Sequence, residues 1–319
     1  MAAPLRVVTG ALGYSGKAIA ERLFARGDRV RTLTNSPDRP NPFGERLEVR
    51  PLAFDDHAAL VDSLRGAETL INTYWVRFNH RLFTFDQAVA NTIRLFEAAR
   101  DAGVGRIVHV SIMKPEQGRG LAYYDGKLRL EEVLRGLGVR HAILRPGVLF
   151  GRGDILVNNI AWVLRHLPVF GVFGDGRYGI QPMHVDDFAA LAVGAMDMPG
   201  GSVLDAAGPE TFEYRGLVRE IARIIGVPRP IVPVPPSVGY AVSKLINPIV
   251  GDVVVTREEI EGLMRGLLLS DHPPAGTTRL TAWAAKHRDR LGRRYASEVR
   301  RRTDRVTAYG VQEYDAATA

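Results

Sequence analysis

TGALGYSG, residues 9–16, decides the fold of this 319-residue chain. The stretch follows LRVVT at residues 5–9, which is typical of a buried strand, and precedes a helical pattern over residues 17–26. In a glycine triplet at this spacing, the first glycine permits a tight turn, the second lets a pyrophosphate approach the backbone, and the third lets the helix pack against the strand. The turn therefore predicts a dinucleotide on the N–H groups that open the helix. Its expected contacts here are Gly10, Leu12, Gly13, Tyr14, Ser15 and Gly16.

Short β-branched runs alternate with helical stretches from residue 5 to about residue 150. Strands are expected at residues 5–9, 30–34, 47–49, 69–72, 106–110 and 141–144, and helices at residues 17–26, 56–65, 85–102 and 123–137. Gly27, Gly66, Gly103 and Gly138 stand where these helices should end. Strand and helix units of this length predict an α/β fold of the Rossmann type, with a doubly wound parallel sheet.

The residue pattern changes after Gly151, and this change predicts a second, smaller lobe. Glycine and proline punctuate residues 168–182, and a helical pattern begins near Asp186. We expect residues 1–150 to form the dinucleotide-binding domain, rejoined by about residues 179–198. Residues 151–319 then form a C-terminal substrate lobe and a basic tail. The lobe carries no recognisable specificity motif, so the small-molecule substrate is not identified by the sequence.

The positive charge of the chain is concentrated near its end. The formal net charge is +7, and residues 286–305 hold nine Lys or Arg against three acids. We expect a solvated, partly frayed terminal helix there. No aromatic platform or base-reading helix accompanies this segment, so no nucleic-acid partner is expected. The chain has no cysteine, which excludes thiol catalysis, disulfides and thiolate metal sites.

Two further features bear on location. The first residues, MAAP, lead directly into a strand pattern without a charged and then apolar leader, so the expected location is cytoplasmic. The apolar stretch at residues 237–255 is interrupted by Lys244, Asn247, Pro248 and Asp252, and is expected to be a buried or interfacial helix. A peripheral position at an anionic membrane surface, or in a protein complex, through residues 237–305 is the alternative. A homodimer is also left open.

The end of the second expected strand bears on the choice of dinucleotide. A carboxylate about 20 residues after the glycine turn would bind the ribose 2′-hydroxyl of NAD. This chain has Leu33-Thr34-Asn35-Ser36 there, followed by Arg39. Amide and guanidinium donors suit a 2′-phosphate, so Asn35 and Arg39 favour NADP(H), with NAD(H) as the alternative. Arg39 as a solvated loop residue is the competing interpretation.

Several motifs together resemble one superfamily over almost the whole chain. They are TGALGYSG at 9–16, LFEAARDAGVGRIVHVS at 95–111, YYDGK at 123–127, LRPGVLFG at 144–151 and GDGRYGIQPMHVDDFAAL at 174–191. With these motifs the sequence resembles the extended and atypical short-chain dehydrogenases/reductases, which are epimerase/dehydratase-like. Within them it is similar to the group that includes the NAD(P)H-binding accessory subunit of respiratory complex I.

The resemblance implies catalytic roles for Tyr123, Lys127 and Ser111. Tyr123 and Lys127 are four residues apart, so they share a helix face, and a nearby ammonium favours the phenolate of a tyrosine. Tyr123 is then the general acid or base. The family usually places two small polar residues after the fifth strand and uses the second, but here Ser111 is followed by Ile112.

The same resemblance extends the expected cofactor contacts to Phe54, Thr73, Lys127, Arg145 and Pro146. Two departures accompany it. The aspartate that contacts adenine in the family corresponds to Ala53, and an asparagine of the fourth helix is shifted to Asn91. The bulky residues 74–78 follow the fourth expected strand, where they line the substrate pocket or pack in the core.

Two functional hypotheses follow. The first is an NAD(P)-dependent oxidoreductase or epimerase that uses Tyr123 for proton transfer. The second is a non-catalytic NAD(P)H-binding structural or redox-sensing protein that resembles complex I accessory subunits. His184, Asp186 and Asp187 suggest a metal ion less well than they suggest helix capping, so no metal is expected.

Overall fold

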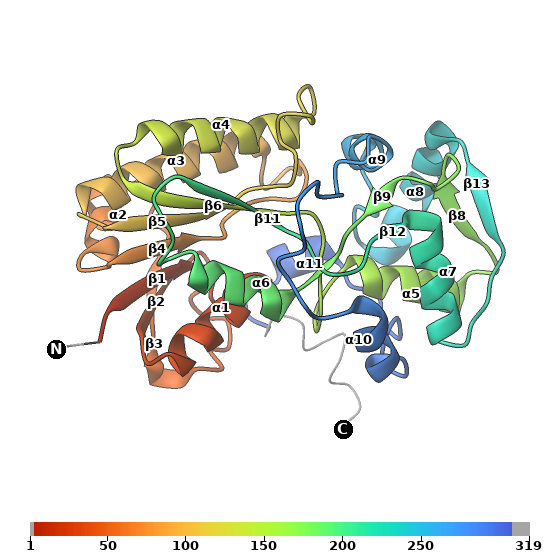
Figure 1. The fold of residues 1–319 in the computed structure, drawn as a ribbon, viewed down its shortest axis with the longest axis horizontal. Helices are drawn as coiled ribbons and strands as arrows, with labels where there is room; N and C mark the ends of the chain where they lie inside the picture. Colours follow the sequence, from red (N-terminus) through yellow and green to blue (C-terminus); the bar gives the residue numbers. More distant parts are fainter. Residues whose placement is uncertain (1–2, 308–319) are drawn as a thin grey trace. The chain divides into compact units, whose positions relative to one another are not determined.

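The computed structural model describes residues 3–307, and the chain divides into two compact units (Figure 1). Unit 1 comprises the residues up to Pro146 together with Asp186–Ala206. Unit 2 comprises Gly147–Val185 and the residues from Ala207 onward. The boundaries expected from the sequence lie at residue 150 and at about residues 179 and 198. Both units are thus assembled from separate segments of the chain.

Unit 1 is built on a seven-stranded sheet in the order β11-β6-β5-β4-β1-β2-β3, in which every neighbouring pair is parallel. The strands are β1 (Leu5–Thr9), β2 (Arg29–Thr34), β3 (Leu47–Pro51), β4 (Thr69–Asn72), β5 (Arg106–Val110), β6 (Arg140–Pro146) and β11 (Ser202–Ala206). Strand order reverses between β1 and β4, as in a doubly wound sheet. The predicted Rossmann-type α/β fold is confirmed.

Helices cover both faces of this sheet. They are α1 (Tyr14–Ala25), α2 (His57–Leu64), α3 (Phe85–Asp101), α4 (Ala122–Gly136) and α6 (Val185–Gly194), with a short 3-10 turn at η1 (Gly44–Arg46). Figure 1 shows α2, α3 and α4 on one face and α1 and α6 on the other. All five residues of β1 are buried, because its two faces both lie under helices. This double cover accounts for the burial of the apolar side chains of β1, Leu5, Val7 and Val8.

The first strand, turn and helix depend on a close backbone approach. Gly10 has a φ of +70°, a conformation that side-chain-bearing residues rarely adopt. An ideal Cβ on Gly16 would lie 2.2 Å from the carbonyl oxygen of Gly10. Residue 16 must therefore lack a side chain if α1 is to rest on the end of β1.

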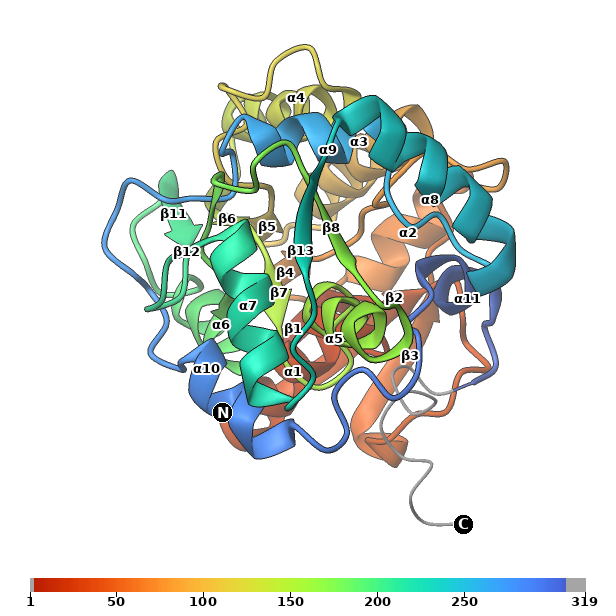
Figure 2. The same ribbon diagram turned by 90° about the vertical axis from the view of Figure 1, so that its right-hand side faces the viewer.

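Unit 2 is assembled from short elements around helices α5 and α7 (Figure 2). Its strands form three two-stranded pairs: β7 (Leu149–Phe150) with β10 (Met183–His184), β8 (Phe170–Phe173) with β13 (Ile231–Val234), and β9 (Gly179–Ile180) with β12 (Phe212–Glu213). Its helices are α5 (Leu156–His166), α7 (Tyr214–Ile224), α8 (Pro236–Val250), α9 (Arg257–Met264), α10 (Leu280–His287) and α11 (Glu298–Thr303). Buried side chains of α5, α7 and α10 share one apolar core.

Two expectations about this unit are corrected. The apolar stretch at 237–255 forms α8, but Leu245 and Ile249 are 74% and 81% exposed, so the buried alternative is wrong. The basic tail is also not simply solvated, because Glu298 and Arg301 of α11 are buried. The Arg301 guanidinium donates to the carbonyl oxygen of Gly153 at 2.7 Å, which anchors α11 to its own unit. Local sequence cannot show such anchoring, because the partner is 148 residues away.

Within residues 3–307, no helix has both the length and the apolar character that crossing a membrane requires.

The contact of Gly16 generates the first prediction. Gly16→Ala should lower the free energy of unfolding by roughly 1–3 kcal/mol, because backbone must move to admit the methyl group. Chemical denaturation of both proteins measures this. Gly136→Ala is the matched control, since a Cβ on Gly136 meets nothing within 4 Å and the residue lies in α4. Equal stability of the Gly16→Ala protein and the wild type would contradict the close approach.

Candidate functional site

The glycine turn is held by main-chain and threonine hydrogen bonds. The Gly10 N–H donates to the Leu33 carbonyl at 3.0 Å, and the Gly13 N–H donates to the Gly10 carbonyl at 2.8 Å. The Ala11 N–H donates to Thr32 Oγ1 at 3.0 Å. Helix α1 then begins after Gly13 with no side-chain cap and no acid in its first turn. Its positive end is therefore not neutralised by a carboxylate, as an anion site requires.

The residues expected at the adenosine end follow β2 directly. Asn35 is exposed and Arg39 is half-buried on the same loop, which is pinned by the Ser36 N–H donating to Thr34 Oγ1 at 3.0 Å. The first carboxylate after the strand is that of exposed Asp38. The end of β2 itself thus presents amide and hydroxyl groups and no acid.

Phe54 and Thr73 flank the turn from the ends of β3 and β4. Phe54 is buried and packs on Tyr74, with ring centroids 4.9 Å apart. The Thr73 hydroxyl donates to the Thr9 carbonyl at 2.6 Å, and the Thr73 N–H donates to Thr9 Oγ1 at 2.7 Å. These bonds fix the end of β4 against the end of β1. Thr73 Oγ1 would lie 3.6 Å from a Cβ on Gly10, so Thr73 borders the turn directly.

A buried polar chain links the ends of three central strands. Thr9 Oγ1 donates to Asn72 Oδ1 at 3.0 Å, and Asn72 Nδ2 lies 3.1 Å from Nδ1 of His109. Burial, and to a lesser extent the nearby Lys127, hold the pKa of His109 well below its usual range. His109 is therefore neutral and accepts the amide proton. This polar chain was not predicted from the sequence, although Asn72 in β4 and His109 in β5 are polar residues that follow apolar ones.

Lys127 of α4 lies under an aromatic ring. Its side chain is 2% exposed, and its Nζ donates to the Val110 carbonyl at 2.8 Å. The same Nζ lies 4.3 Å from the centroid of the Trp75 ring, at cation–π distance. Burial lowers the pKa of Lys127 to about 7, against the opposing effect of Glu131. The ammonium thus sits at the end of β5, next to Ser111.

Tyr123 stands one turn before Lys127 on α4 and is half-buried. Its ring meets those of Trp75 and Phe85 edge-on, with both centroid distances at 5.7 Å. Gly126 makes room for Trp75, because a Cβ there would lie 3.0 Å from the indole ring. Of the bulky residues 74–78, Val76 and Phe78 are buried in the core, while Trp75 packs against Tyr123 and Lys127.

Ser111 follows β5 and is 2% exposed. Its N–H donates to the Leu144 carbonyl at 2.7 Å, but its Oγ makes no hydrogen bond within the described part of the chain. A buried hydroxyl without a protein partner carries a free-energy cost that a bound polar group can remove. The next residue, Ile112, is buried and apolar. The end of β5 thus carries one buried hydroxyl, that of Ser111, without a partner in the described part of the chain.

Arg145 and Pro146 end β6. The Arg145 guanidinium donates to both carboxylate oxygens of buried Glu131, at 2.9 and 2.6 Å, and to Glu116 at 2.6 Å. Burial alone would lower the pKa of Arg145, but these carboxylates raise it above its usual value. The Pro146 carbonyl accepts the Met113 N–H at 3.0 Å. Both residues thereby tie β6 to α4 and to the segment after Ser111.

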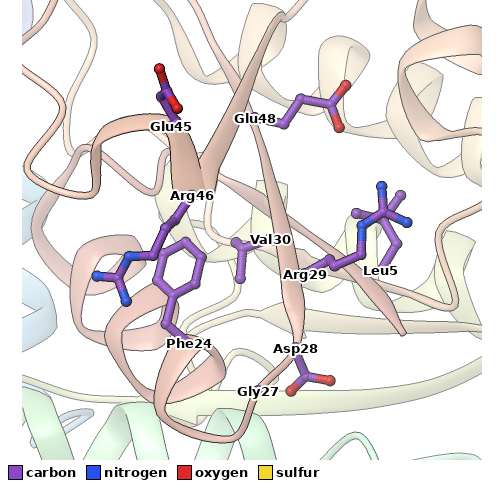
Figure 3. Close-up of a pocket in the computed structure, with 9 residues that line it drawn as sticks. All are labelled: Leu5, Phe24, Gly27, Asp28, Arg29, Val30, Glu45, Arg46 and Glu48. Atoms are coloured by element: carbon purple, nitrogen blue, oxygen red, sulfur yellow. The ribbon is translucent and has the colours of Figure 1, made fainter. Parts of the chain in front are cut away.

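Two other places are separate from this constellation. Asp186 and Asp187 lie in the first turn of α6, and residues 3–307 contain no group of three His, Asp or Glu side chains that could hold a metal ion. A hollow of about 390 Å³ (Figure 3) lies at the amino ends of β1 and β2, opposite the edge that carries the glycine turn. Its lining residues are Leu5, Phe24, Gly27, Asp28, Arg29, Val30, Glu45, Arg46 and Glu48.

Sequence comparisons agree with the architecture of unit 1. A family model described as NAD(P)H-binding matches residues 10–156. A (4-alkanoyl-5-oxo-2,5-dihydrofuran-3-yl)methyl phosphate reductase of Streptomyces griseus is 30% identical over 229 residues, which are 70% of this chain and 74% of that protein. The mitochondrial NADH dehydrogenase (ubiquinone) 1 alpha subcomplex subunit 9 of Arabidopsis thaliana is 25% identical over 285 residues, or 83% and 71% of the two chains.

Solved structures share the fold. The NADPH-dependent quinone oxidoreductase QOR2 of Escherichia coli, complexed with NADPH, superposes with a TM-score of 0.72 and 21% identity, covering 88% of this chain and 99% of that one. A nucleoside-diphosphate-sugar epimerase of Staphylococcus aureus gives 0.69 and 16%, over 84% and 92%. At these identities the likeness shows the fold alone. With the glycine turn and the sequence relatives, it establishes that the chain belongs to the NAD(P)H-binding, extended short-chain dehydrogenase/reductase-like family.

Proposed function

We propose that this protein is an NADP(H)-dependent oxidoreductase or epimerase acting on a small carbonyl or hydroxyl compound. The observation that carries the proposal is the pairing of two neighbouring groups at the end of β5. The Val110 carbonyl holds the buried Lys127 ammonium at 2.8 Å, and the next residue, Ser111, has a buried Oγ with no partner in the described chain. Tyr123 lies on the same face of α4 as Lys127.

The residues of the glycine turn fit a dinucleotide. Gly13 leaves no side chain between the backbone and an incoming pyrophosphate, Gly16 lets α1 pack on the end of β1, and the uncapped start of α1 supplies N–H donors. Asn35 and Arg39 would take the 2′-phosphate of NADP(H), while Phe54 and Thr73 border the turn. Arg145 already binds the carboxylates of Glu131 and Glu116. Its proposed contribution is therefore to hold α4 in position. The nicotinamide, when bound, supplies or accepts a hydride at carbon.

The protein side chains would then bind the substrate oxygen and exchange a proton with it. Ser111 Oγ donates a hydrogen bond to the carbonyl oxygen and holds it in place. In the reductive direction the carbon gains the hydride and the oxygen gains the Tyr123 proton, which yields an alcohol and leaves a phenolate. Lys127 favours the phenolate electrostatically, and solvent restores the proton. In the oxidative direction Tyr123 accepts the proton.

One observation favours the alternative of a non-catalytic NAD(P)H-binding protein. Ile112 stands where the family usually has its second small polar residue. The relatives also include a subunit of mitochondrial NADH dehydrogenase. Three expectations stay predictions under either proposal: membership of a protein complex, formation of a homodimer and a cytoplasmic location.

The catalytic proposal predicts that Tyr123→Phe lowers turnover by roughly 10²–10⁴-fold, because the proton donor is lost while the ring contacts with Trp75 and Phe85 remain. NADPH oxidation is followed with a panel of quinones, ketones and aldehydes. NADPH affinity should not change. Tyr124→Phe, which removes the neighbouring hydroxyl, is the matched control and should keep full activity. Equal turnover by Tyr123→Phe and wild type, or no turnover of any carbonyl tested, would favour the non-catalytic alternative.

The cofactor proposal predicts tighter binding of NADPH than of NADH. Arg39→Ala should weaken NADPH binding by roughly tenfold or more, because a charge-assisted hydrogen bond to the 2′-phosphate is lost. NADH, which lacks that phosphate, serves as the internal control and should bind both proteins alike. Fluorescence titration of the two nucleotides measures each affinity. Preference of the wild type for NADH would refute the assignment of Asn35 and Arg39.

The buried ammonium predicts a pH dependence of stability. Between the folded pKa of about 7 and the usual value of 10.5, the unfolded chain holds a proton on Lys127 that the folded chain does not. The burial penalty is fully present below pH 7 and is relieved as pH rises. The free energy of unfolding of the wild type, relative to Lys127→Met, should therefore rise on the order of 3 kcal/mol between about pH 7 and pH 10.

Urea denaturation at several pH values tests this difference. Lys244→Met is the matched control, because Lys244 is exposed on α8 and should show almost no such slope. A flat difference between wild type and Lys127→Met across this range would mean that the ammonium is not desolvated in the folded protein.

A further inference from the structure

Helix α8 carries an exposed apolar stripe. Val238, Val242, Leu245 and Ile249 are spaced by four, three and four residues, so they lie along one face of the helix. They are 50%, 46%, 74% and 81% exposed. We call these four side chains the apolar stripe. The face that a surface helix turns to water is normally charged or polar, so the pattern of α8 is reversed.

The opposite side of α8 supplies its packing contacts within unit 2. A Cβ on Gly239 would lie 2.5 Å from the Phe173 ring of β8, and Ser243 is buried. The helix contains no acid, and Lys244 is its single charged residue. The apolar stripe is thus not the face of α8 that packs within unit 2. It is a second apolar face, directed away from β8.

Basic side chains surround α8. The Arg257 guanidinium and the Lys244 Nζ both lie over the Tyr240 ring, at 4.9 and 5.4 Å from its centroid. Beyond the end of α8, Asp252 accepts the N–H groups of Glu298 and Val299 at 3.1 and 3.0 Å. These bonds place α11 beside the carboxyl end of α8, as Figure 2 shows.

Exposed arginines lie on α11 and on the segment just before it. Arg293 and Arg300 are exposed on either side of its first residue. Three of the acids in this region are engaged internally, Asp252 by the backbone of α11, Glu298 by Arg302 and Glu259 by the capping box of α9, while exposed Asp289 lies 3.8 Å from Arg288. With nine Lys or Arg against three acids, residues 286–305 nevertheless carry a net positive charge.

We propose that α8 lies in the surface of an anionic phospholipid bilayer. The apolar stripe would enter the boundary between head groups and acyl chains, while Lys244, Arg257, Arg293 and Arg300 meet lipid phosphates. At 15 residues, α8 is about 22 Å long, which suits an in-plane helix better than a span of about 20 residues. A second copy of this chain is disfavoured as the occupant, because it would bring the same basic groups against one another.

Flotation with phosphatidylcholine vesicles, with and without about one-quarter phosphatidylglycerol, tests the proposal on the full-length protein. The wild type should bind the anionic vesicles at least roughly tenfold more tightly than the neutral ones. Leu245→Glu/Ile249→Glu should lose this binding by at least about tenfold. Val169→Glu is the matched control, because it charges an exposed apolar residue of unit 2 outside α8, and it should bind like the wild type.

The contribution of the arginines to vesicle binding is tested separately. Arg293→Gln and Arg300→Gln should each weaken binding to anionic vesicles about fivefold, and added salt should act in the same direction. Unchanged thermal unfolding of each variant shows that it is folded. Absence of vesicle binding, equal binding to both lipid mixtures, or full binding by Leu245→Glu/Ile249→Glu would overturn the proposal. A wild-type dimer that this double variant converts to monomer, without vesicle binding, would instead assign the stripe to a second copy.

Discussion

The contact between Gly16 and the carbonyl of Gly10 is the constraint on which unit 1 depends. It lets α1 start within reach of the β1 end, so that the helix amino terminus opens at the edge of the sheet where the strands finish. A methyl group there would separate the two elements. Because β1 is an interior strand of the sheet, paired with β2 on one side and with β4 on the other, its displacement would disturb both neighbours.

The same edge shows how a buried sheet carries polar chemistry. Thr9, Asn72 and His109 hydrogen-bond to one another across three strands and fix the strand ends in register. Lys127 extends this set from α4 through the Val110 carbonyl. Two buried atoms of this set, Ser111 Oγ and His109 Nε2, make no hydrogen bond within the described chain.

Element bounds that depend on neighbouring residues were predicted correctly from the sequence. Bounds and contacts that depend on distant segments were not. The bounds of β4 and β5 were predicted to the residue, since both are short apolar runs between clear breaks. Helix α1 begins at Tyr14 and not at Lys17, because backbone packing at Gly16 overrides the low helix propensity of glycine. Strand β6 runs to Pro146 because it pairs with β11, which local patterns do not reveal. The engagement of Arg145 by Glu131 and Glu116 was likewise invisible.

The late position of β11 has a consequence for how the protein forms. This edge strand pairs with β6 from 60 residues further along the chain, after the whole excursion of Gly147–Val185 into unit 2. On a ribosome, β6 would emerge with an open hydrogen-bonding edge and wait for Ser202–Ala206 to be synthesised. An unpaired parallel edge is a template for association with other chains. Slow translation of residues 147–201 would therefore prolong the interval in which nascent chains are prone to aggregate.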